Sequence, residues 1–446
     1  MSTKRLSLIA LILILLLAAC GGDSAPEATV ESDGVAGETA VTPTIPPDAT
    51  LPPPIIAEID ETAQESEPAT QETTTETEPP TEEAVPEPKG PWPADKFGYG
   101  TQVHGNATVG DSGQTMRTVK EQLGLDWVKA QVQWWAIHPS PDADQWFFYD
   151  AVVDEAANND LNLMLSIVGA PEWTRAAGGE NGPPDDYAEF AKFLEELLTR
   201  YDGKVAAIEV WNEMNLDREW ATPNGVNPED YVQFLKVANE TIKAHDPNIM
   251  VISGALSPTG PGDWISWADD FEWLDRALAA GLLDYADCVG AHHNGYNIPP
   301  DVTAEAAPTH PEAQTAVFRG PFDNPYHLWS FKTTLDTYAE KIKAYDPDKK
   351  LCVTEFGWAT VEDYDTLPQG FEFAQDNTLQ EQADYIVQAY QQMHDSGNVW
   401  LAFLFNYDFG NKGGGPTDDP VPYSIIDING VPRPAFGAVA NMEKPD

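Results

Sequence analysis

The feature that most constrains this chain is an alternation of short apolar runs with amphipathic helical patterns, repeated eight times after residue 96. The apolar runs fall at 97–103, 127–132, 161–168, 205–211, 249–253, 286–291, 351–354 and 399–405. Several are apolar at consecutive positions, which is typical of parallel strands covered by helices. Eight β/α repeats within about 350 residues predict an α/β fold, a single (β/α)8 TIM barrel.

Helix signals between these runs agree with that fold. Asn227 and Pro228 precede acidic residues and a 3.6-residue apolar period, and Thr378 with Glu381 forms a capping-box pattern. A doubly wound open sheet is the alternative, but it favours a glycine-rich phosphate turn after its first strand. Gly98 and Gly100 lie inside that strand instead, so the barrel is preferred.

The N-terminus has the pattern of an export signal. Lys4 and Arg5 precede an apolar run at 6–17, which is too short to span a bilayer core of roughly 30 Å. An ordinary cleaved signal or a short anchor is one interpretation. However, Leu-Ala-Ala-Cys at 17–20 resembles the lipobox of bacterial lipoproteins. The resemblance implies a signal peptide over 1–20, lipidation of Cys20, and a domain anchored in the cell envelope outside the cytoplasm.

Residues 21–92 are expected to form a disordered linker. The segment 21–90 holds 12 Pro, 12 Thr and 17 acidic residues against one Lys, and it contains no aromatic residue. Such a composition does not bury enough apolar surface to offset the entropy of ordering. We therefore predict one folded domain at 93–446, and we expect it to act as a monomer.

Charge and cysteine content exclude several classes of function. The net charge is −49, of which residues 91–446 carry −35, so a phosphate backbone would be repelled and no nucleic-acid partner is expected. Cys288 and Cys352 fall on neighbouring predicted strands and are expected to be buried free thiols. No cofactor is indicated. No metal is expected either, because His104, His138, His292 and His293 lack metal-ligand spacing.

Two glutamates stand out among the polar residues that follow the predicted strands. Glu213 follows the fourth strand and Glu355 the seventh, at the barrel end where such folds carry their chemistry. A carboxylate pair flanking a sugar is what glycoside hydrolysis requires. A structural ion pair at the barrel rim fits the spacing equally well.

A family resemblance favours catalysis. Trp-Asn-Glu-Met-Asn at 211–215 resembles the strand-4 motif of clan A glycoside hydrolases, and Val-Thr-Glu-Phe-Gly at 353–357 resembles their strand-7 nucleophile segment. Family 39 is the most similar, with the cellulase-like family 5 as a neighbour. The resemblance implies a retaining enzyme with Glu213 as acid/base, Glu355 as nucleophile and Asn212 on the sugar 2-hydroxyl. Met214 departs from the usual proline.

The remaining candidate site residues are substrate-binding ones. His292 and Tyr296 are favoured after strand 6, by resemblance to a His-x-Tyr pattern whose register is uncertain here. Trp127 and Trp400 are assigned to the core, whereas aromatic and polar residues at strand ends are candidates for sugar contacts: His104, Trp134, Trp135, Trp173, Trp358 and Asn406. The expected substrate is an extracellular β-linked oligo- or polysaccharide. A non-catalytic carbohydrate-binding barrel and a transglycosylase are the alternatives.

Overall fold

The computed structural model describes residues 91–179 and 181–445. The predictions for the signal peptide, Cys20 and most of the linker lie outside these residues. Within the described part of the chain, no helix is both long and apolar enough to cross a membrane.

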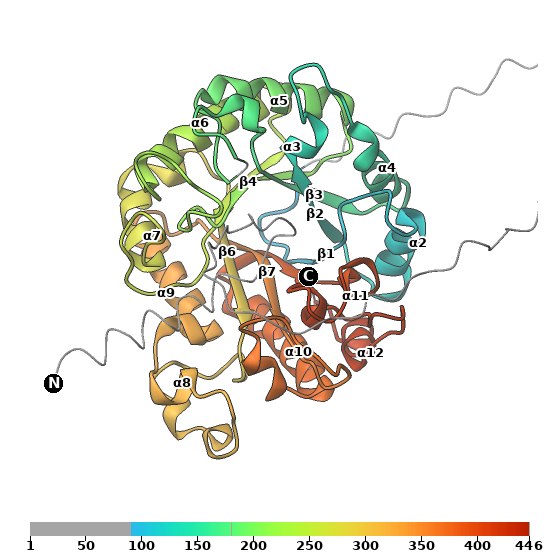
Figure 1. Cartoon of the computed structure of the whole chain (residues 1–446), viewed down its shortest axis with the longest axis vertical. Helices are drawn as coiled ribbons and strands as arrows, with labels where there is room; N and C mark the ends of the chain where they lie inside the picture. Colours follow the sequence, from blue (N-terminus) through green and yellow to red (C-terminus); the bar gives the residue numbers. More distant parts are fainter. Residues whose placement is uncertain (1–90, 180, 446) are drawn as a thin grey trace, which may run out of the picture. The chain divides into compact units, whose positions relative to one another are not determined.

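Eight parallel strands form the centre of the domain and close into a barrel (Figure 1), as the alternation predicted. Hydrogen-bonded neighbours follow the order β5-β4-β3-β2-β1-β8-β7-β6, and isolated bridges Ile252–Cys288 and Leu256–Ala291 join β5 to β6. The strands are β1 (Gly98–Gln102), β2 (Trp127–Gln133), β3 (Asn162–Val168), β4 (Ala207–Asn212), β5 (Met250–Ala255), β6 (Val289–Gly295), β7 (Leu351–Trp358) and β8 (Val399–Leu404).

The larger helices surround the barrel, and shorter ones lie in the connecting loops (Figure 1). Asn227 and Thr378 cap their helices through side-chain hydrogen bonds, and the predicted capping box is present. The α-helices are α2 (Ser112–Arg117), α3 (Trp134–Ile137), α4 (Asp150–Asn158), α5 (Tyr187–Arg200), α6 (Pro228–His245), α7 (Asp270–Ala279), α8 (Gly320–Asp323), α9 (Phe331–Lys343), α10 (Leu379–Ser396), α11 (Phe409–Lys412) and α12 (Pro434–Asn441).

The barrel interior is filled by apolar side chains at its lower end, where the strands begin. Trp127, Met164, Met250, Leu401 and Phe403 belong to this cluster. β1 offers glycine there: a Cβ on Gly100 would lie 2.6 Å from the Phe403 ring and 2.8 Å from Trp127 Cβ. Because Gly98 and Gly100 have no side chain, the large rings of Trp127 and Phe403 have room inside the barrel.

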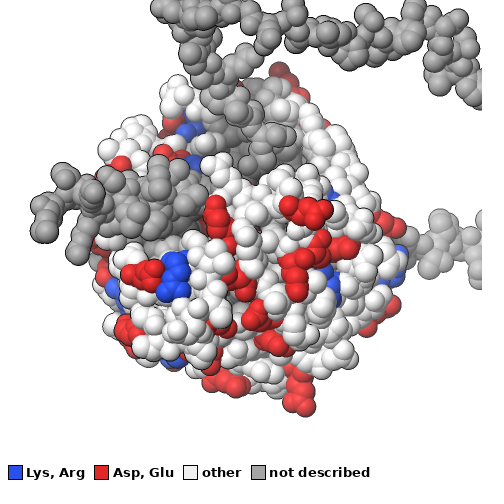
Figure 2. Space-filling model, turned by 60° about the horizontal axis from the view of Figure 1, so that its bottom comes forward, with Lys and Arg blue, Asp and Glu red and all other residues white. Residues whose placement is uncertain are grey.

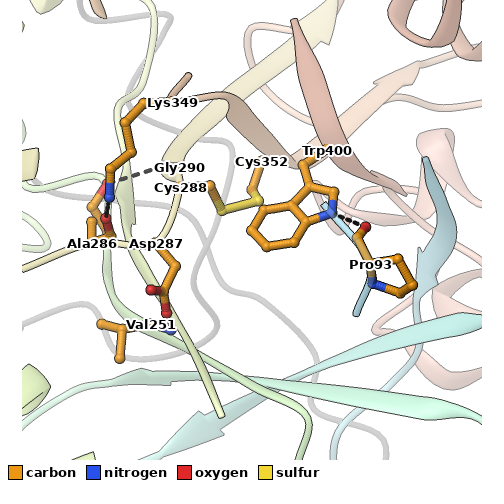
Figure 3. Close-up of a disulfide and its surroundings, with 10 residues drawn as sticks. Pro93, Val251, Ala286, Asp287, Cys288, Gly290, Lys349, Cys352 and Trp400 are labelled. Carbon is orange, nitrogen blue, oxygen red and sulfur yellow. Dashed lines mark hydrogen bonds between the residues drawn. A yellow bond between two sulfur atoms is a disulfide. The ribbon is translucent and has the colours of Figure 1, made fainter. Parts of the chain in front are cut away.

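A disulfide joins Cys288 to Cys352, which corrects the prediction of free thiols (Figure 3). Gly290 of β6, not Cys288, is the ladder partner of Cys352. Cys288 precedes β6 and approaches Cys352 diagonally, and the two Cα atoms are 5.8 Å apart, a separation that a disulfide spans without strain. The free thiols were expected because directly paired residues of parallel strands seldom offer disulfide geometry, and Cys288 and Cys352 are not such a pair.

Candidate active site

Glu213 and Glu355 meet at His292, near the upper ends of β4, β7 and β6. His292 Nδ1 lies 3.3 Å from Glu213 Oε1 and 3.8 Å from Glu355 Oε2, so both carboxylates contact one ring. All three side chains are nearly inaccessible to solvent, with exposures of 7%, 1% and 1% for Glu213, Glu355 and His292. The structure thus brings together the two predicted catalytic residues and one predicted substrate-binding residue.

Irregular backbone aims these side chains. Trp211 and Glu213 adopt positive φ angles of 76° and 39° at the end of β4, where the Glu213 amide donates to the Ala255 carbonyl of β5. The β6–β7 ladder shifts register between Ala291 and His292, so His292 pairs with Glu355. Such irregularities re-aim side chains at the end of a strand and often lie beside active sites.

A buried ion-pair network lies below the two glutamates. Lys129 of β2 is fully buried, with Nζ 3.1 Å from Glu209 Oε2 and 3.2 Å from Glu355 Oε1. Burial acts to lower the pKa of Lys129, but the two carboxylates outweigh it and raise this pKa above its usual value. Asn294 of β6 adds a weak contact of 3.4 Å to Glu355 Oε2. Glu355 therefore sits beside a fixed positive charge.

Arg218, on the loop after β4, forms an ion pair with Glu213. Burial raises the pKa of Glu213, but the charge of Arg218 and the hydrogen bond from His292 outweigh burial and hold this pKa at about 2. Burial acts to lower the pKa of His292, but Glu355 and Glu213 raise it by more, so the net shift of this pKa is upward. In this arrangement Glu213 is ionised and His292 readily carries a proton.

Asn212 and Tyr296, both predicted to bind substrate, also lie near Glu213. Asn212 is the last residue of β4, and its buried Oδ1 has no hydrogen-bond partner among the described residues. Tyr296 is half-buried and packs against Phe318, Trp329 and Phe373. Desolvation raises its pKa, and the charge of Glu213 raises it further. Met214, at the position where proline is usual, packs over Gly254 of β5.

Four other residues predicted to bind substrate make their contacts with residues other than Glu213 and Glu355. Trp358 is fully buried and donates from Nε1 to the Ile298 carbonyl, so it is a core residue rather than a sugar platform. Asn406 is also buried, and its side chain bonds to Pro420 and Phe409 within the loop. His104 contacts the loop after β8 through Asp408 and Phe409. Trp135 is partly buried and donates to Gln133.

Trp134 and Trp173 line a groove of about 840 Å³ between the α3 region and α5. Neither Glu213 nor Glu355 lines this groove. Trp134 is only 1% exposed and stacks on Phe193, so its faces are not open to a sugar. Trp173 is 39% exposed, and its Nε1 donates to the His138 carbonyl. His138 itself lies in this groove, and His293 is buried against Phe331 of α9.

One group of described residues has a spacing that metal ligands show: Asp269, Asp270 and His327. Asp270 already accepts hydrogen bonds from the Thr259 amide, His327 and the Tyr338 hydroxyl, and Asp269 accepts from Tyr326. These contacts tie α7 to α9 and the segment before α9. The group is accounted for as structural.

Sequence reasoning missed Lys129, Glu209 and Glu219, and it gave Arg218 only as a basic residue near the barrel mouth, without Glu213 as its partner. Lys129 and Glu209 each lie two residues beyond an apolar inward position, Trp127 and Ala207, which is the signal that would have placed them inside the barrel. Arg218 and Glu219 lie on a loop, where no periodicity reports the direction of a side chain.

Comparison with solved structures finds similar folds at low sequence identity. No family model matches the chain. No curated protein sequence matches it either. Among solved structures, a monomeric β-xylosidase from Caulobacter crescentus CB15 is 17% identical with a TM-score of 0.50, over 79% of this chain and 68% of that chain. A β-glycosidase is 14% identical with a TM-score of 0.52, over 80% of this chain and 99% of that chain. At these identities the likeness shows the fold.

Proposed function

We propose that this chain is a retaining glycoside hydrolase that acts on an extracellular β-linked oligo- or polysaccharide. The observation that carries the proposal is the meeting of Glu213 and Glu355, from the fourth and seventh strands, at one ring nitrogen of His292. A non-catalytic carbohydrate-binding barrel has no need of such a buried carboxylate pair.

In this proposal Glu355 attacks the anomeric carbon and Glu213 protonates the leaving oxygen. Lys129 holds the Glu355 carboxylate in place through a buried ion pair, as a positioned nucleophile requires. Water then attacks the glycosyl-enzyme from the side of Glu213, which now accepts a proton, and the configuration is retained. The Oδ1 atom of Asn212 is a free acceptor for the sugar 2-hydroxyl.

The electrostatics of the site favour a neutral glycan as substrate. The described domain is strongly acidic, and acidic side chains outnumber basic ones on the face shown in Figure 2. Three cations on the segments after β3, β4 and β8 are already engaged: Arg175 with the carbonyls of Pro183 and Ala221, Arg218 with Glu213, and Lys412 with Asp408. A polyanionic chain would gain little from them.

Two variants test the assignment on a panel of aryl β-glycosides. Glu213→Ala is expected to slow substrates with poor leaving groups by roughly 100-fold or more, and activated substrates far less, because only the former need protonation. Azide then attacks the glycosyl-enzyme and gives a β-glycosyl azide of retained configuration. Glu355→Ala is expected to abolish turnover of every substrate, and azide attack in its cavity gives the inverted α-azide.

Product configuration decides the outcome. Azides of the same configuration from both variants, or near-normal rates in both, would contradict the assignment. Glu172, which follows β3 at the same end of the barrel, would then be the next carboxylate to test. Substrate binding without turnover by the unaltered protein would support the carbohydrate-binding alternative. Transfer to added acceptor sugars in preference to water would identify a transglycosylase.

A further inference from the structure

A groove on the outer side of the barrel has no part in the proposed reaction. Its volume is about 840 Å³, within the range that small ligands occupy in proteins. One wall is the segment 138–146, between α3 and α4, and the other is one side of α5, which lies outside the barrel (Figure 1). Trp173, in a short 3-10 helix after β3, also lines it. Three separate segments thus form one hollow.

The floor of this groove is a stack of aromatic rings. The Phe193 ring of α5 lies parallel to the Trp146 ring, with the two centroids 5.8 Å apart and an angle of 3° between the planes. On its other contact Phe193 stacks on Trp134, with centroids 5.0 Å apart. All three side chains are buried, and each ring is held by its neighbours. The floor is therefore apolar and already formed before a ligand arrives.

Trp173 adds an exposed ring to this groove. It is 39% exposed and is the only exposed tryptophan among the described residues. Its Nε1 donates to the His138 carbonyl at 2.9 Å, and its ring meets Trp134 edge to face, with centroids 6.5 Å apart. These contacts hold the indole in place and satisfy its one polar atom, so the surface left open is apolar. A fixed, flat, apolar ring is the kind of group on which the apolar face of a sugar stacks.

Charged side chains surround the apolar surface of the groove. Five carboxylates and two cations line it: Asp142, Asp144, Glu189, Glu195, Glu196, Lys192 and Arg200. Both cations are already paired, since Lys192 Nζ lies 2.6 Å from Glu189 Oε1 and Arg200 forms an ion pair with an aspartate of α4. Asp142, Asp144 and Glu195 have no hydrogen-bond or ion-pair partner in the described part of the chain. These three carboxylates are open acceptors for the hydroxyl groups of a ligand.

The charge of the lining discriminates between classes of ligand. With five carboxylates against two cations, the groove repels an anionic chain such as a sulfated glycan. A basic peptide would find carboxylates over much of this acidic domain, so charge alone gives the groove no preference for it. A neutral glycan uses both features of the groove, because its apolar ring faces stack on an indole and its hydroxyl groups donate to carboxylates.

We propose that this groove is a second glycan-binding site, which takes a neutral β-linked oligo- or polysaccharide with one sugar ring stacked on Trp173. Neither Glu213 nor Glu355 lines the groove, so the ligand is held apart from the reaction. The choice of a β-linked chain rests on the proposed function, whereas the geometry of the groove does not. A second site on the same protein keeps a polymeric substrate at high local concentration around the first.

Hydroxyl-radical footprinting tests the groove without any need for activity. The experiment uses a Glu355→Gln parent chain, which lacks the proposed nucleophile, so that the sugar is not consumed. Short β-1,4-linked oligosaccharides of glucose, xylose or mannose should slow the oxidation of Trp173 by about threefold or more, because a stacked sugar covers the ring. Phe147 is the internal reference, since it is 56% exposed, lies on the neighbouring segment and does not line the groove. Its oxidation should not change.

Substitution of the exposed ring provides a second measurement, by titration calorimetry of the same oligosaccharides against the same parent chain. Trp173→Ala should weaken binding at the groove by about tenfold or more, so that one molecule fewer is bound per chain. Trp173→Phe keeps a flat ring and should weaken binding by about threefold or less. Phe147→Ala is the matched control, because it removes an exposed ring beside the groove, and it should bind like the parent chain.

Each outcome decides for or against the second site. Protection of Trp173 together with this order of affinities supports it. No protection by any of the oligosaccharides, or equal binding by Trp173→Ala and the parent chain, would overturn it. Protection by a lysine-rich peptide but not by the sugars would overturn it in favour of a site for cationic peptides. If the unaltered protein hydrolyses glycosides but Trp173 is not protected, the second site fails and the proposed function stands. Protection without hydrolysis of any glycoside gives the reverse result.

Discussion

Lys129 shows how strongly single residues define this site. Its ammonium group is the positive charge between Glu209 and Glu355, and none of the three side chains is more than 1% exposed. A buried pair adds little net stability over an apolar substitute, but removal of one partner leaves an uncompensated charge. The pair fixes the carboxylate of Glu355 from below.

Lys129→Met should therefore lower the free energy of unfolding by about 3–5 kcal/mol at neutral pH, as measured by denaturant unfolding. Adding Glu209→Gln should recover part of the stability, since one stranded charge is then gone. A single variant as stable as the unaltered protein would show that the ion pairs of Lys129 contribute nothing to stability.

At this scale the sequence predicted the acids better than their partners. Glu213 and Glu355 were found because each interrupts an apolar strand pattern. Because a polar residue was taken to end a strand, the predicted sixth and seventh strands end too early. His292 and Glu355 belong to β6 and β7, which run on to Gly295 and Trp358. Trp358 was therefore placed on a loop when it is a strand residue packed under α9. Arg218 depends on a loop conformation that no pattern encodes.

At the scale of elements, strands β6 and β7 are joined covalently as well as by their ladder. The Cys288–Cys352 bond closes 64 residues of sequence, including the long connection that carries α8 and α9. In Figure 3 the indole of Trp400 lies beside this bond, and its Nε1 donates to the Pro93 carbonyl at 2.9 Å. The lower end of the barrel is therefore held together where β6, β7 and β8 begin.

Replacing both cysteines by alanine should lower stability by about 4 kcal/mol if the chain-entropy account of disulfides holds for a loop of this length. Each single variant breaks the same bond, so the double variant should cost little more than either one. Thermal unfolding with and without reductant measures this. An unaltered protein that is insensitive to reductant, and variants of equal stability, would show that the bond contributes nothing.

The positions of the strands and the helix caps were predictable because they depend on local sequence patterns. The predicted starts of the second, seventh and eighth strands coincide with β2, β7 and β8. The disulfide was not predictable, since it depends on where Cys288 lies relative to the first ladder pair of β6. The general rule concerns paired residues, and Cys288 lies just outside the ladder.

On the scale of the whole molecule, our proposal that the protein is exported starts from the N-terminal sequence. Residues 91–446 carry −35, and disulfides persist mainly in oxidising compartments. The disulfide thus supports the proposal that the barrel works outside the cytoplasm, tethered through the acidic 21–90 segment.

Deletion of residues 21–90 should leave the thermal unfolding midpoint of the domain within about 2 °C of the full chain, because the composition of this segment predicts few packed contacts. Calorimetry on the two proteins at the same pH and ionic strength makes the comparison. A midpoint many degrees lower after deletion would mean that the segment packs on the barrel.

Cys20 carries the last prediction, because the proposed membrane attachment depends on its thiol. In a bacterium that processes lipoproteins, the unaltered chain should incorporate a labelled fatty acid and sediment with membranes, and Cys20→Ser should lose the label. An uncleaved signal can retain a protein at the membrane, so the label is the decisive readout and sedimentation the supporting one. The Cys288→Ala, Cys352→Ala protein is the control, since it lacks two thiols but keeps Cys20 and should remain labelled. Label in the Cys20→Ser chain, or none in the unaltered one, would mean that the export signal is an ordinary one and that the tether has no lipid.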